Sequence, residues 1–196
     1  MNHRTVLIAA GILSSALLLT GCSTGGMNMN GSSGTSPSAS ASTASAHNDS
    51  DVAFATQMIP HHQQAVEMAD ILLAKAGVDS RVIDLAKQIK AAQDPEIVTM
   101  TGWLKAWGQP SPAPMDGMAM NGMMSQADMD ALKNASGADS SKLFLEQMTQ
   151  HHQGAIDMAN EELSSGKDAD ALALAKKIVA AQTAEIATMK DLLASM

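Results

Sequence analysis

The chain has 196 residues, of which 45% are hydrophobic, and its 12 basic and 20 acidic side chains give a formal charge of −8. This length suits one domain with appendages. The acidic balance argues against a protein that binds a phosphate backbone, and two Trp, two Phe and no Tyr offer no stacking platform for single-stranded nucleic acid. We therefore expect no nucleic-acid partner. A single Cys also excludes an internal disulfide framework and a cysteine-based zinc site.

The first 21 residues are typical of a signal peptide. Arg4 precedes a largely apolar run without charge, Val6 to Leu19, which is short for a membrane span. The run ends in Leu-Thr-Gly-Cys22, which resembles the bacterial lipobox, whose cysteine becomes the first mature residue and carries a lipid. The sequence predicts an extracytoplasmic lipoprotein, anchored through Cys22 to the outer face of the cytoplasmic membrane. An ordinary signal peptide and outer-membrane anchoring are the alternatives.

A flexible tether is expected over residues 22–48. Most of this segment is Gly, Ser, Thr and Ala, which cannot bury enough apolar surface to fold. The folded domain is therefore expected over residues 49–196.

One unit occurs twice in this domain. FATQMIPHHQQAVEMA at 54–69 returns as FLEQMTQHHQGAIDMA at 144–159, and IKAAQDPEIVTMTGWL at 89–104 returns as IVAAQTAEIATMKDLL at 178–193. Apolar residues in each segment recur at steps of three and four, which predicts helices. Two helical hairpins, repeats 49–107 and 139–196, then bury their apolar faces against each other. The sequence predicts an all-α fold, an antiparallel four-helix bundle with helices over about 50–76, 79–107, 139–165 and 168–195.

Two prolines fall inside the predicted helices of the first repeat. The second repeat has other residues in place of Pro60 and Pro95, so we expect both helices to continue through them with a kink. Alternatively, the first helix begins at Pro60.

The segment that joins the repeats, residues 108–124, is rich in Met. Its Pro and Gly residues exclude a regular element. We expect its thioethers to be exposed and to capture soft metal ions, with plain low-complexity sequence as the alternative. The residues concerned are Met115, Met118, Met120, Met123 and Met124.

The strongest chemical signal is a paired histidine that follows a methionine by three residues. Met58 precedes His61 and His62 on one predicted helix face, and the second repeat has Met148, His151 and His152 at the matching places. Imidazole and thioether together favour copper, above all Cu(I), over hard ions. Core packing of the methionines and a hydrogen-bonded histidine layer are the alternatives.

Each histidine pair is predicted to have a polar partner on the second helix of its own hairpin. Counted from the turns, Gln93 and Glu96 are level with the first pair, and Gln182 and Glu185 are level with the second. A buried carboxylate needs a partner, and either a metal ion or the histidines would supply one.

The doubled pattern Met-x-x-His-His-x-x-Ala-x-x-Met resembles the bacterial domain-of-unknown-function 305 family, over roughly residues 49–196. This resemblance implies a ferritin-like four-helix bundle, and some members of the family are secreted copper-binding proteins linked to copper tolerance. The resemblance implies these candidate metal ligands: Met58, His61, His62, Met68, Met148, His151, His152 and Met158.

The favoured function is therefore a lipid-anchored protein that buffers copper outside the cytoplasm. The second possible function is that of a structural or partner-binding helical bundle without metal. A ferritin-like dimetal oxidase is the third, although the chain has no Glu-x-x-His motif. No catalytic constellation is recognisable, so we expect no enzyme.

Overall fold

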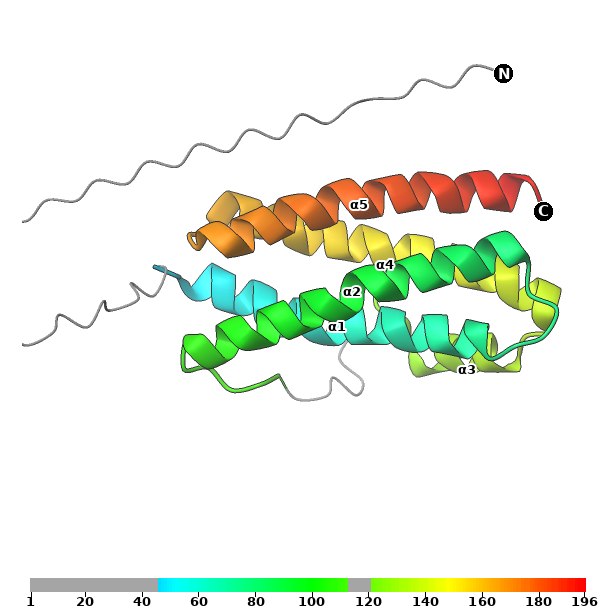
Figure 1. The fold of residues 1–196 in the computed structure, drawn as a ribbon, viewed down its shortest axis with the longest axis horizontal. Coiled ribbons are helices and arrows are strands. Elements are labelled where there is room, and N and C mark those ends of the chain that lie inside the picture. The colour runs from blue at the N-terminus through cyan, green and yellow to red at the C-terminus, as the bar shows by residue number, and fades with distance from the viewer. Residues whose placement is uncertain (1–45, 113–120) are drawn as a thin grey trace, which may run out of the picture. The chain divides into compact units, whose positions relative to one another are not determined.

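The computed structural model describes residues 46–112 and 121–196, and these residues form five helices and no strand. Figure 1 shows the long helices side by side, with the short helix against them. The predicted all-α class is confirmed for this part of the chain, whereas Cys22 and the predicted signal peptide lie outside it. The helices are α1 (Asp49–Leu73), α2 (Ser80–Ala106), α3 (Gln126–Asn134), α4 (Gly137–Ser165) and α5 (Ala169–Ala194).

The short helix α3 was not predicted from the sequence. Ser125 caps it: its hydroxyl accepts the backbone N–H of Asp128, whose carboxylate accepts the backbone N–H of Ser125. The helix buries only Met129 and Leu132, so its apolar pattern is too brief to stand out from a polar linker. The bounds of the four long helices fall within three residues of the predicted ones.

Both prolines lie inside helices, Pro60 in α1 and Pro95 in α2, as the repeat predicts. The alternative that the first helix begins at Pro60 is wrong. Helix α1 begins eleven residues earlier because Asn48 caps it: its side chain accepts the backbone N–H groups of Ser50 and Asp51.

The long helices pack in a defined order. Helix α1 packs against α2, α4 packs against α5, and α1 packs against α4 (Figure 1). The start of α4 at Gly137 touches the backbone of Ala76 and Gly77 just after α1, and the end of α4 bonds to the start of α1. Helices α1 and α4 are therefore antiparallel. Helix α3 packs against both of them.

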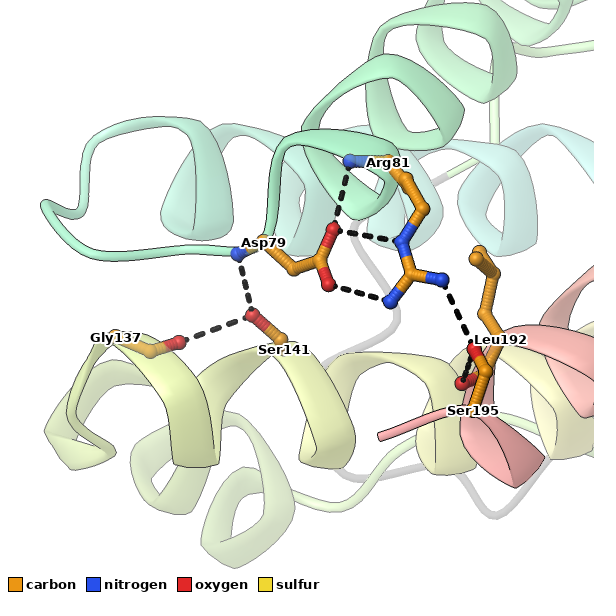
Figure 2. A network of polar contacts seen from close by, with 6 residues as sticks. All are labelled: Asp79, Arg81, Gly137, Ser141, Leu192 and Ser195. Carbon is orange, nitrogen blue, oxygen red and sulfur yellow. Dashed lines mark hydrogen bonds and ion pairs between the residues drawn. The ribbon is translucent and has the colours of Figure 1, made fainter.

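A polar network joins the α1–α2 turn to α4 and α5 (Figure 2). The backbone N–H of Asp79 donates to the Ser141 hydroxyl at 3.0 Å, and the Arg81 guanidinium donates to the Ser195 hydroxyl at 2.9 Å. Arg81 also pairs with the Asp79 carboxylate, which caps α2. The start of α2 is thereby tied to both helices of the second repeat.

A second network, at the other end of the helices, joins the start of α1 to the α4–α5 turn. The Asn48 side-chain amide donates to the Ser165 carbonyl at 2.8 Å. The Asp51 carboxylate accepts the backbone N–H groups of Lys167 and Asp168 at 3.0 and 2.9 Å. We call this set the N-terminal clamp. It links residues up to 117 positions apart in the sequence.

The apolar core consists of two clusters. One contains Met58, Phe54 and Met100, and the other contains Met68 and Met148. Since Met58 precedes His61 along α1 and Met68 follows it, the histidines lie between the two clusters. The core of this protein is therefore divided by a polar layer, which is the candidate site.

Candidate metal centre

The two histidine motifs meet where α1 crosses α4. The rings of His61 and His151 have centroids 3.7 Å apart and an interplanar angle of 37°. Both residues are buried, with 0% and 1% of their surface exposed. They hold equivalent places in the two repeats, so the antiparallel pairing of like helices brings each against its counterpart. The two motifs therefore lie at one height in the structure.

Each neighbouring histidine binds a glutamate from the second helix of its own hairpin. His62 Nε2 lies 2.9 Å from Glu96 Oε2, and His152 Nε2 lies 2.7 Å from Glu185 Oε2. Both glutamates therefore lie level with the histidine pair of their own hairpin, as predicted. We call the four histidines with these two glutamates the imidazole layer.

Most ring nitrogens of this layer have no hydrogen-bond partner. Buried polar side-chain atoms are nearly always paired, so unpaired atoms gathered at one place need an explanation. The amide oxygens of Gln93 and Gln182, each three residues before the glutamate on its own helix, are unpaired as well. The unpaired nitrogens are Nδ1 and Nε2 of His61, Nδ1 and Nε2 of His151, Nδ1 of His62 and Nδ1 of His152.

Burial keeps three of these imidazoles neutral, those of His61, His62 and His151. It lowers the pKa of His61 to about 3, assisted by His62 and His152 and opposed by the backbone of Asn121. Burial also lowers the pKa of His62, against the attraction of Glu96. It lowers the pKa of His151 well below the usual value, with the other imidazoles adding to the effect. At neutral pH the lone pairs of these three rings are therefore not taken up by protons.

The carboxylate of Glu96 is bonded to the His62 ring and to the Lys177 ammonium. Burial acts to raise its pKa, but His62 and the Lys177 ammonium outweigh burial, and the pKa is lowered. Lys177 Nζ on α5 lies 3.1 Å from Glu96 Oε1 on α2. Lys177 was not singled out from the sequence.

The imidazole layer is closed on its α1–α4 side by residues 121–124. Gly154 of α4 allows the backbone of Asn121 and Gly122 to approach so closely that a side chain at position 154 would collide with it. At the matching place on α1, the Gln64 side chain bonds both backbone groups of Met124, at 2.7 and 2.9 Å. Solvent reaches the layer instead past Glu96 and Glu185, whose side chains are 8% and 20% exposed.

The predicted methionine ligands lie in different surroundings. Met58 and Met148 are fully buried, one helical turn before the histidines, and Met68 is fully buried in the core. Met158 is partly exposed and lines a cavity of about 200 Å³ with Phe54 and other residues of α1 and α4. Of these four methionines, Met58 and Met148 are the nearest in sequence to the histidines. Both are buried, so they also contribute to core packing.

The expectation that the linker methionines are all exposed is wrong for Met124. Only 6% of Met124 is exposed, because its side chain packs into the core between α1, α3 and α4. Met123 is partly exposed. Met115, Met118 and Met120 lie outside the described residues.

Within residues 46–112 and 121–196, no three His, Cys, Asp or Glu side chains are grouped so that they could hold one metal ion. Imidazole nitrogens alone thus do not complete a three-residue site. The donors present, unpaired imidazole nitrogens with buried thioethers one helical turn earlier on the same helices, fit a soft ion of low coordination better than a hard ion that needs many oxygens. In the same ranges, no helix is both long and apolar enough to cross a membrane.

Comparison with solved structures places this chain among helical proteins with related sequences. A candidate secreted DUF305 protein from Streptomyces coelicolor is 36% identical, with a TM-score of 0.69 over 74% of this chain and 91% of its own. A DUF305 fragment from Deinococcus radiodurans is 30% identical, with a TM-score of 0.69 over 76% of this chain and 98% of its own.

A third related structure carries a metal. CopM in its Cu(I)-bound form is 32% identical, with a TM-score of 0.64 over 74% of this chain and 96% of its own. CopM has also been solved in Cu(II)-bound and Ag-bound forms. No curated protein matches the sequence. The family model described as domain of unknown function (DUF305) matches residues 51–193, and the chain therefore belongs to the DUF305 family.

Proposed function

We propose that this protein binds copper outside the cytoplasm and buffers it in the imidazole layer. The observation that carries the proposal is the set of six unpaired ring nitrogens on four buried histidines. Such nitrogens cost free energy in a core and have no packing advantage over carbon. In a metal site they are the ligands themselves.

The glutamates of the layer have a defined part in this proposal. A neutral imidazole has one N–H and one lone pair, and the partner of one nitrogen decides which atom carries the proton. Glu96 and Glu185 accept from Nε2 of His62 and His152, so Nδ1 of each ring presents its lone pair to the interior. His61 and His151 supply further nitrogens, and Met58 and Met148 supply the thioethers that favour Cu(I). Met68 and Met158 belong to the wider candidate set.

The relatives support copper over other ions. CopM, at 32% identity over 74% of this chain, has structures with Cu(I), Cu(II) and silver bound. Silver(I) is a soft ion like Cu(I), and thioether ligands select such ions. The proposal includes no catalytic step, because the chain has no Glu-x-x-His motif for a ferritin-like dimetal site.

The proposal is tested by titrating residues 23–196 anaerobically with Cu(I), Cu(II), Ag(I) and Zn(II). We expect at least one Cu(I) or Ag(I) per chain with high affinity and weaker Zn(II) binding. A variant with His61, His62, His151 and His152 all changed to Gln should lose this binding and stay helical by circular dichroism. If the variant binds copper with the same stoichiometry and affinity, the layer is not the copper site.

We also propose that the four long helices are a ferritin-like four-helix bundle derived from two duplicated hairpins. The contact between His61 and His151 supports this, because it joins equivalent residues of the two repeats. The two His–Glu pairs repeat the same geometry in each hairpin. A bundle without metal, which binds a partner or serves structure, is the competing function, and the quadruple variant separates the two.

Lipid anchoring through Cys22 is the final part of the proposal. Cys22 is the only thiol in the chain, so no other residue can carry the thioether-linked lipid. The variant Cys22→Ala should therefore appear in the aqueous phase on detergent partitioning, while the wild-type chain enters the detergent phase. A Cys22→Ala chain that still carries lipid by mass spectrometry contradicts the lipoprotein assignment.

A further inference from the structure

The two halves of the imidazole layer differ in charge. On one side, Glu96 binds both His62 and the Lys177 ammonium, at 2.9 and 3.1 Å. On the other side, Glu185 binds His152, and among the described residues no lysine or arginine lies within ion-pair distance of it. One carboxylate is thus neutralised by a cation from the protein, and the other is not.

The repeat identifies the residue responsible for this difference. The second-helix segments align with an offset of 89, so Lys177 on α5 corresponds to Gln88 on α2. Lys177 reaches across to the glutamate of α2. By the symmetry of the repeat, its counterpart Gln88 is expected at the matching place for the glutamate of α5. A positive charge in one repeat is therefore a neutral amide in the other. Lys176 and Lys87, one residue earlier, are lysine in both repeats.

The position of Lys177 puts its charge at the open side of the layer. Its side chain is 63% exposed, whereas the side chain of Glu96 is only 8% exposed. The ammonium therefore covers the more buried carboxylate on the side by which solvent reaches the histidines. A metal cation that approaches His62 from this side meets a like charge and a carboxylate already paired.

We propose that Lys177 is an internal counter-cation that makes the two halves of the imidazole layer unequal and sets the order in which they bind metal ions. The inference rests on the proposed copper-binding function. The half with His152 and Glu185 binds the first ion, because its carboxylate is free of a competing cation. The half with His62 and Glu96 binds afterwards and more weakly, because the ion must displace or tolerate the Lys177 ammonium.

The test uses Ag(I), which is diamagnetic, added stepwise to residues 23–196 in nitrate buffer. Side-chain ¹H–¹⁵N spectra follow the imidazole signals of His62 and His152 separately. In the wild-type chain we expect the His152 signals to shift first. In Lys177→Gln the two sets should shift together, with the second step about three- to fivefold tighter, the size expected from an exposed ion pair.

The chain offers matched variants for this experiment. Lys176→Gln removes the same charge one residue away, on a side chain that makes no ion pair with Glu96, and should behave as wild type. Gln88→Lys should weaken the first step about three- to fivefold, and the double variant Gln88→Lys with Lys177→Gln should reverse the order.

The outcomes separate the two proposals. If Ag(I) and Cu(I) do not bind the wild-type chain, the proposed function fails and this inference fails with it. If they bind but the His62 and His152 signals shift together, the inference alone is wrong. It is also wrong if Lys176→Gln changes the order as much as Lys177→Gln does, because the effect then comes from net charge.

Discussion

Replacing His61 and His151 by Leu should make the metal-free protein more stable and remove its response to copper. The four ring nitrogens of these two residues are buried and unpaired. Each unpaired buried group costs about 1–3 kcal/mol, and leucine fills a similar volume without polar atoms. We therefore expect the free energy of unfolding to rise by about 2 kcal/mol or more, which raises Tm by roughly 4–8 °C in a chain of this size.

The measurement is thermal and urea unfolding in the presence of a chelator, and then with Cu(I). Wild type should gain stability with Cu(I), since an ion that binds only the folded state stabilises it. The double variant should show the same Tm with and without Cu(I). Ile59→Leu, a change at a buried apolar position next to the layer, is the control and should keep the response.

The opposite result would be equally informative. If the two histidines hold the core together through hydrogen bonds, their replacement by Leu lowers the free energy of unfolding. The protein would then be the metal-free bundle that the sequence left as a second reading. If the variant is instead more stable and no longer binds metal, the two histidines are retained for metal binding and not for stability.

Replacing Glu162 by Gln should remove a loss of stability between pH 5 and pH 8. Glu162 on α4 is 1% exposed and lies beside the carboxylate of Asp51. Burial raises its pKa to about 8, with Asp51 and Asp168 of the N-terminal clamp adding to the effect. In the unfolded chain the pKa of this carboxyl is near its usual value of 4.5.

The sign follows from proton binding. Between these two pKa values the folded chain holds one more proton than the unfolded chain, so its stability falls as pH rises. The slope is about 1.4 kcal/mol per pH unit, and it ends near pH 8, where the folded state also loses the proton. Glutamine keeps the shape of the protonated acid without a titrating group. At pH 8 the variant should therefore be more stable than wild type by on the order of 4 kcal/mol.

Urea unfolding at pH 5, 6, 7 and 8 measures this slope. Glu161→Gln changes an exposed carboxylate one residue earlier and should leave the slope unaltered. Asp51 acts in another range. Burial acts to raise its pKa, but backbone N–H donors outweigh burial and lower the pKa, so its contribution is lost as pH falls below the usual range of a carboxyl. An identical slope in wild type and Glu162→Gln would mean that Glu162 is not held protonated by the fold.

The hairpins and the level of the glutamates could be predicted because they depend on local rules. A helix repeats every 3.6 residues, so counting from a turn places Glu96 beside His62 without knowledge of the rest of the fold. The duplication then implies the same for Glu185 and His152. The contact of His61 with His151 also follows from the repeat, since like surfaces of two equal hairpins meet.

The features that were missed depend on contacts between distant segments. Helix α3 and the buried side chain of Met124 are fixed by packing against α1 and α4, which the linker sequence does not show. Glu162 is polar by type, and only the docking of the α4–α5 turn onto α1 buries it. Lys177 could have been noticed, because it is a charge that one repeat has and the other lacks.

The N-terminal clamp has a mechanical consequence. If a lipid on Cys22 holds the chain, any drag on the domain is transmitted through the residues just before α1. At that point the Asn48 amide and the Asp51 carboxylate are bonded to Ser165, Lys167 and Asp168, at the end of the other hairpin. These hydrogen bonds must break before the start of α1 can separate from the second hairpin. They therefore distribute the force over both hairpins. A pull on the tether therefore acts on both hairpins together and does not separate α1 from α4. The histidines of these two helices then stay opposite each other.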